Sequence, residues 1–75
     1  MDSRPELAAR LEDAERGITE AKARITRQEV VTARLAAVGM DADPSRMLLE
    51  RLREALVEMY RTRRLIMREI ASASR

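Results

Sequence analysis

The sequence predicts an all-α fold: a two-helix antiparallel hairpin of coiled-coil type that occupies residues 1–75 as a single domain. Two amphipathic stripes predict the helices, at about residues 4–38 and 44–71, because apolar residues recur in each at alternating steps of three and four. A short break over residues 39–43, followed by Pro44, predicts the turn. Since so short a connection brings two helices side by side, we expect them to pack antiparallel.

The first helix is expected to start with a capping box and to end at a glycine. Ser3 and Glu6 have the capping-box spacing, in which both side chains accept first-turn amides. Gly39 is expected to adopt the left-handed conformation, with Met40 folding back onto Leu35 as in a Schellman motif. The residues at alternating a and d positions of a seven-residue repeat are Leu7, Leu11, Ala14, Ile18, Ala21, Ile25, Gln28, Thr32 and Leu35.

The second helix is expected to begin at Asp43, whose carboxylate caps it, with Pro44 at the first helical position. Its seam consists of Leu49, Leu52, Leu56, Met59, Arg63, Ile66 and Ile70. Further apolar residues widen this seam, namely Met47, Leu48, Val57, Tyr60, Leu65 and Met67. An apolar surface wider than one seam indicates a second helical neighbour.

Folding the chain about residue 41 predicts which side chains face each other. Gln28 is then expected beside Leu56, and Arg63 beside Glu20 and Ala21. Two interpretations of Arg63 stay open: an ion pair with Glu20 that fixes the register, or a side chain that extends along the apolar surface into solvent.

The small size of the chain favours self-association. A two-helix seam barely offsets the chain entropy of 75 residues, and disulfides are excluded because cysteine is absent. With no histidine and only scattered carboxylates, we expect neither a metal nor a cofactor. We therefore expect a homodimer in the form of a four-helix bundle. The residues expected at its interface are Ala14, Gly17, Ala21, Leu52, Leu56, Met59, Tyr60 and Met67.

Gly17 is open to two interpretations, because a glycine in a helix costs about 1 kcal/mol relative to alanine. It either allows close approach of another subunit's helix or is a tolerated imperfection.

Basic charge is concentrated in the second helix. Residues 44–75 carry eight arginines against four glutamates, whereas residues 1–43 carry nine acidic and seven basic residues. Arg61, Arg64 and Arg68 recur at helical spacing and are the candidate nucleic-acid contacts. The alternative is a solvated charged face, which is favoured because Glu58 and Glu69 lie within one turn.

Several classes of function have no support in the sequence. There is no histidine, no pairing of a nucleophile with a base and no glycine-rich phosphate loop, so we expect no enzyme. The longest uncharged run falls well short of the roughly 20 residues that span a bilayer, and the first residues lack the order of a secretory signal. We expect a cytoplasmic interaction or regulatory module that binds itself or another protein. The alternative is a nucleic-acid-binding regulator.

Two strings of residues carry a resemblance to a known family. They are Ala14-Glu15-Arg16 with Arg24-Ile25-x-Arg27-Gln28-Glu29, and Arg63-x-Leu65-Ile66-x-Arg68-Glu69-Ile70. Over about residues 12–70 the chain resembles a family of short, uncharacterised helical-hairpin proteins of alphaproteobacteria. That family often has histidine where this chain has Glu12 or Asp13 and near Thr62, so any role of those histidines is lost here. The resemblance implies a hairpin and no particular activity.

Overall fold

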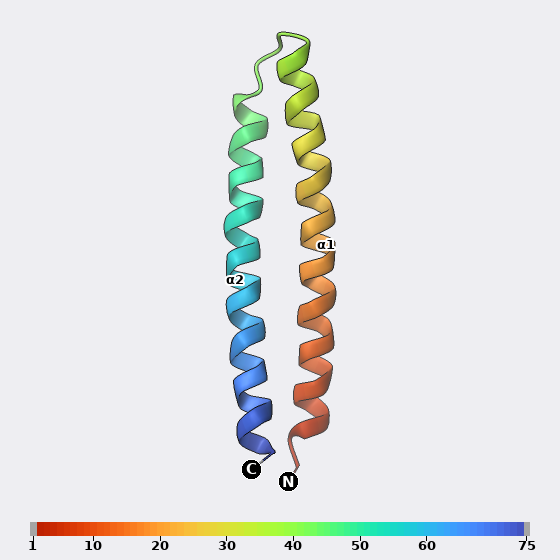
Figure 1. The fold of residues 1–75 in the computed structure, drawn as a ribbon, viewed down its shortest axis with the longest axis vertical. Coiled ribbons are helices and arrows are strands. Elements are labelled where there is room, and N and C mark those ends of the chain that lie inside the picture. The colour runs from red at the N-terminus through yellow and green to blue at the C-terminus, as the bar shows by residue number, and fades with distance from the viewer. Residues whose placement is uncertain (1, 75) are drawn as a thin grey trace.

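The computed structural model describes residues 2–74 and consists of two helices, α1 (Arg4–Ala37) and α2 (Asp43–Ala73). The helices lie antiparallel, with both ends of the chain at one end of the rod and the connection at the other (Figure 1). The Cα atoms extend over 59 × 14 × 13 Å. The all-α hairpin is thus confirmed. α2 continues two residues beyond its predicted end, where the backbone N–H of Ser74 donates to the Ile70 carbonyl at 3.1 Å.

Both helices start at an aspartate that lies two residues before the first helical residue. The Asp2 carboxylate accepts the backbone N–H of Arg4 at 3.0 Å, and the Asp41 carboxylate accepts that of Asp43 at 3.0 Å. Each bond satisfies an amide that has no acceptor within its helix. Hydrogen bonds from Arg4 to Asp2 also hold the pKa of this carboxyl below its usual value, because they favour the charged form.

The two predicted caps are therefore wrong. Ser3 makes no side-chain capping bond, and Asp43 is already part of α2, where its carboxylate accepts a 2.6 Å hydrogen bond from Arg46. The aspartates that do cap stand three residues before Pro5 and Pro44. The repeated Asp-x-x-Pro spacing is the sequence signal of both helix starts.

A Schellman motif ends α1, as predicted. Gly39 has φ +75°, a left-handed conformation that glycine adopts without steric cost. The backbone N–H of Gly39 donates to Ala36 at 3.2 Å, and that of Met40 donates to Leu35 at 2.9 Å. The side chain of Met40 nevertheless stays 61% exposed, so it adds little of the apolar contact expected of this motif.

We expect Gly39→Ala to lower the free energy of unfolding by about 1 kcal/mol, because a Cβ is disfavoured at positive φ. Gly39→Asn is the control, since asparagine tolerates this conformation better, and it should cost clearly less. Thermal unfolding followed by circular dichroism at one protein concentration measures both. Equal losses in the two variants would contradict the role assigned to the backbone conformation.

The seam of the hairpin is formed by the predicted a and d positions. All of them are buried or half-buried, and α2 adds the buried Ser45. The buried apolar residues are Leu7, Ile18, Ala21, Ala42, Leu49 and Ile66. Among the residues described, no side chain is less than 2% exposed, because a two-helix layer leaves its seam open on two sides.

The register of the two helices differs from the prediction. The Thr32 and Ser45 hydroxyls lie 2.6 Å apart, and the side chain of Gln28 also forms a hydrogen bond to Ser45. The prediction placed Gln28 beside Leu56. The difference moves α2 by about six residues relative to α1. The cause is the connection, which descends beside the end of α1 before α2 begins (Figure 1). Residues 40–42, which link the turn to α2, span up to about 10 Å when extended. This length is close to the rise of about six helical residues.

A polar cluster occupies the seam near the turn. The side-chain amide of Gln28 donates to the Ser45 hydroxyl at 2.6 Å, and the Thr32 hydroxyl donates to the backbone carbonyl of Gln28 at 2.8 Å. Since the hydrogen of Thr32 is used in that bond, Ser45 is the donor in the 2.6 Å bond between the two hydroxyls. Each side chain in this cluster therefore has a partner across or along the seam.

Candidate association surface

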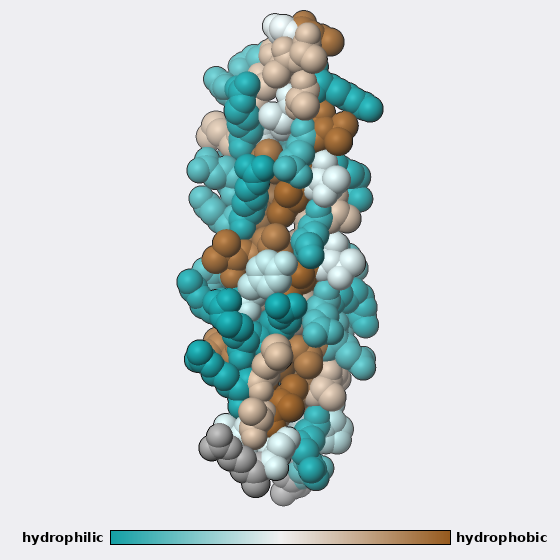
Figure 2. All heavy atoms as spheres, viewed as in Figure 1, coloured by the Kyte–Doolittle hydropathy of each residue, from teal (hydrophilic) through white to brown (hydrophobic). Residues whose placement is uncertain are grey.

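The rod exposes more surface than a compact protein of the same mass, and several large apolar side chains contribute to it. Its accessible area is 5893 Å², whereas a compact protein of this mass exposes about 4,700 Å². An interrupted brown apolar band runs along the rod on the face shown in Figure 2, bordered on both sides by hydrophilic side chains. The large apolar side chains that remain exposed are Val30, Val31, Val38, Met40, Met47, Leu48, Val57, Leu65 and Met67.

Two cross-helix ion pairs border the seam on its opposite sides and define two flanks. Arg10 bonds to Glu69 at 3.4 Å, and Arg53 bonds to Glu29 at 3.2 Å. Following the seven-residue repeat from the first pair gives the Gly17 flank, which consists of Arg10, Gly17, Arg24, Val31, Val38, Leu48, Ala55, Thr62 and Glu69. Following it from the second gives the Tyr60 flank, which consists of Ala8, Glu15, Lys22, Glu29, Ala36, Arg46, Arg53, Tyr60 and Met67.

The structure distributes the predicted interface residues over three places. Within the hairpin seam lie Ala14, Ala21, Leu52, Leu56 and Met59, all buried or half-buried. Gly17 belongs to one flank, whereas Tyr60 and Met67 belong to the other. A single flat contact with another helical layer therefore covers Gly17 or the Tyr60 and Met67 pair, but not both.

Arg63 occupies its predicted seam position with a different partner. The new register places it opposite the small side chain of Ala14, so Glu20 is out of reach and no ion pair forms between them. Its guanidinium lies 5.0 Å from the centre of the Tyr60 ring, within the range of a cation–π interaction. Among the described residues, its buried Nε has no hydrogen-bond partner.

The predicted arginine patch lies on the exposed surface of α2. Arg61 donates two hydrogen bonds to the Glu58 carboxylate, at 2.9 and 3.1 Å, so its charge is largely balanced locally. Arg64 and Arg68 are exposed. Arg61 thus has an acidic partner within one turn, whereas Arg64 and Arg68 take part in none of the ion pairs among the described residues.

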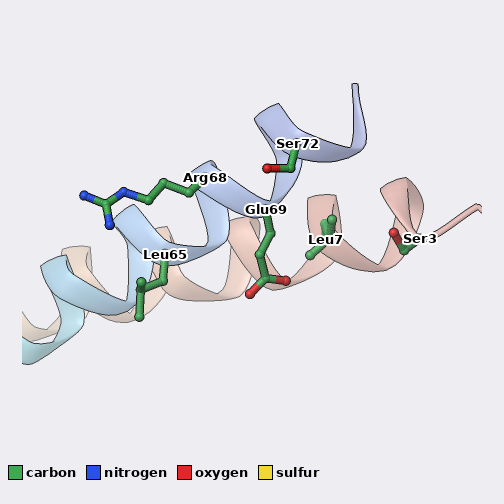
Figure 3. A pocket seen from close by; sticks show the side chains of 6 residues that line it. All are labelled: Ser3, Leu7, Leu65, Arg68, Glu69 and Ser72. Atoms are coloured by element: carbon green, nitrogen blue, oxygen red, sulfur yellow. The ribbon is translucent and has the colours of Figure 1, made fainter. Parts of the chain in front are cut away.

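A shallow pocket of about 420 Å³ lies near the ends of the chain, lined by Ser3, Leu7, Leu65, Arg68, Glu69 and Ser72. Figure 3 shows the Glu69 carboxylate between Leu65 and Leu7, while the Arg68 side chain extends away from the other residues. The carboxylate already accepts the hydrogen bond from Arg10. The pocket therefore offers an apolar floor beside a satisfied carboxylate, and no pair of groups suited to acid–base chemistry.

Residues 2–74 lack two further features, a group of side chains suited to a metal ion and a helix apolar enough to cross a membrane. No three His, Cys, Asp or Glu side chains in this range gather closely enough to hold a metal ion. Neither of the two helices described is apolar over the length that a bilayer crossing requires. What the described fold presents to its surroundings is thus a partly open apolar seam with two unequal flanks.

Comparison with protein-family models, with curated proteins and with solved structures found no match for this chain. The resemblance to the alphaproteobacterial hairpin family stays a prediction.

Proposed function

We propose that this protein is a small, non-enzymatic helical module that associates with itself, as a homodimer in which two hairpins form a four-helix bundle, and that acts in protein interaction or regulation. We further propose that it acts in the cytoplasm and needs no cofactor. The observation that carries the proposed self-association is the half-covered seam, in which even the most buried side chains retain some exposure.

The exposed area supports a dimer quantitatively. Two separate hairpins expose twice the 5893 Å² of one. A compact protein of twice the mass exposes about 7,800 Å², which leaves about 4,000 Å² for the two copies to cover. Obligate dimers bury about 2,000–5,000 Å² in total, so the hairpin has enough uncovered surface for an interface of that class.

We expect sedimentation equilibrium at micromolar concentration to give twice the chain mass of 8.6 kDa. The midpoint of thermal unfolding should also rise with protein concentration, because dimerisation stabilises the folded state by mass action. A fully helical protein with the mass of one chain and an unfolding midpoint independent of concentration would refute self-association.

Nucleic acid is the alternative partner and is tested in the same preparation. Binding through Arg61, Arg64 and Arg68 should weaken steeply with salt, and it should fall when all three become glutamine. The pairing of Arg61 with Glu58 argues against this alternative. Oligonucleotide binding that is salt-dependent and abolished in the triple variant would support it.

A further inference from the structure

The two flanks of the seam differ sharply in charge. Of the nine residues of the Tyr60 flank, five are charged, and they are spread along its length. The Gly17 flank has three charged residues, and two of these, Arg10 and Glu69, neutralise each other near the ends of the chain. From Gly17 to the turn, Arg24 is the single charge on that flank. Desolvating the Gly17 flank therefore costs less.

The Gly17 flank is also flat and apolar. Val31 and Leu48 are each 46% exposed, and the register places them side by side near the turn. Gly17, Ala55 and Thr62 are small and leave the middle of the flank low. A Cβ built on Gly17 meets nothing within 4 Å, so α2 does not come close enough to require a glycine here. The space above this glycine is free for a helix from outside the hairpin.

Two side-chain interactions involving charged groups lie at the Tyr60 flank. The ion pair between Glu29 and Arg53 bridges the two helices across the seam. The Arg63 guanidinium lies against the Tyr60 ring and covers the neighbouring part of the seam. A second helical layer on this side would have to separate or bury these charged groups.

We propose that a second copy of this chain packs on the Gly17 flank, and that the Tyr60 flank faces solvent in the dimer. This inference rests on the proposed self-association and specifies its surface. The occupant is a second copy because the hairpin exposes about 1,200 Å² more than a compact protein of its mass, which exceeds the roughly 800 Å² that each partner contributes to a standard interface. The inference also gives Gly17 its role, the close approach of the second copy's helices.

The same substitution on the two sides of the rod tests this assignment. Val31 lies on the Gly17 flank, and Val57, 55% exposed, lies on the surface of α2 beside the Tyr60 flank. We expect Val31→Glu to raise the dissociation constant of the dimer about a hundredfold, because it buries an unpaired carboxylate. Val57→Glu should change the constant by less than about threefold. Sedimentation equilibrium measures both, and circular dichroism checks that each variant stays helical.

A second matched pair of variants shows whether any dissociation in the valine variants comes from lost helix stability and not from the lost contact. Ala55→Glu on the Gly17 flank should dissociate the dimer, whereas Ala33→Glu, an exposed alanine beside the Tyr60 flank, should not. Glutamate and alanine are both good helix formers, so neither change should unfold the hairpin. A wild-type dimer that resists both changes on the Gly17 flank, or that Val57→Glu dissociates equally, would overturn the surface assignment while leaving self-association intact. A monomeric wild type would refute the proposed function itself.

Discussion

Replacing Ile66 by alanine should lower the free energy of unfolding by about 3 kcal/mol, because it leaves a cavity where the seam is most completely closed. Ile66 is 3% exposed, the lowest value in the apolar core together with Ala42. In so small a protein, each kcal/mol moves the unfolding midpoint by about 4–8 °C, so this midpoint should fall by at least about 12 °C. Thermal and urea unfolding, followed by circular dichroism, give the two measurements.

The neighbouring Met67 supplies the control for this prediction. It is 50% exposed, and Met67→Ala removes a comparable apolar volume from the adjacent position of the same helix. Its cost should stay below about 1 kcal/mol, because exposed side chains contribute little to folding. If the two variants lost equal stability, the seam would not be the main source of the fold's stability.

Ser45→Ala should destabilise the hairpin by about 2 kcal/mol, which is the second largest effect we expect. The hydroxyl of Ser45 accepts from Gln28 and donates to Thr32, both at 2.6 Å, and the substitution removes both bonds. Gln28 then keeps only its 3.4 Å bond to the Ser45 backbone carbonyl, and Thr32 only its bond to the Gln28 backbone carbonyl. Unfolding by urea measures this loss directly.

Removing the whole polar cluster should have the opposite consequence. The triple variant Gln28→Leu, Thr32→Val and Ser45→Ala leaves no unsatisfied group, so its stability should return to or exceed that of the original chain. Its amide NMR spectrum should show more than one set of signals, because the seam near the turn no longer holds polar groups that select a single register. A triple variant as unstable as the single one, with one set of signals, would contradict the role of the cluster in fixing the register.

Much of the fold could be predicted because it depends on local and periodic features. The seam positions follow from the seven-residue repeat, and the end of α1 follows from Gly39. The helix starts were predicted correctly, at Arg4 and Asp43. The capping side chains were not, because Ser3 and Asp43 match the usual cap residues, whereas the acceptors are Asp2 and Asp41, one or two positions earlier. Competition between nearby carboxylates and hydroxyls for the same amide depends on backbone geometry, which residue type alone does not specify.

The candidate surface was predicted only in part, for a related reason. Tyr60 and Met67 were expected to widen the seam, and Gly17 to lie at the interface with another subunit. A pattern along one helix, however, does not tell which side of the partner helix each residue adjoins. The cross-helix pairs Arg10 with Glu69 and Arg53 with Glu29 supply that information. They separate an apolar flank from a charged one, and the surface proposed for the second copy depends on this separation.

Two antiparallel helices joined at Gly39, and the apolar face of each helix, could be predicted from the sequence alone, because these properties repeat every turn and need no knowledge of the other helix. The register could not, because it depends on how the two helices pack against each other. The path of the connection shifts α2 by about six residues relative to the predicted register. Ser45 therefore bonds to Gln28 and Thr32, and Arg63 lies against Tyr60 in place of its predicted partner Glu20. A register is a relation between distant segments, set by the geometry of the turn and by the polar groups that must find partners in the seam.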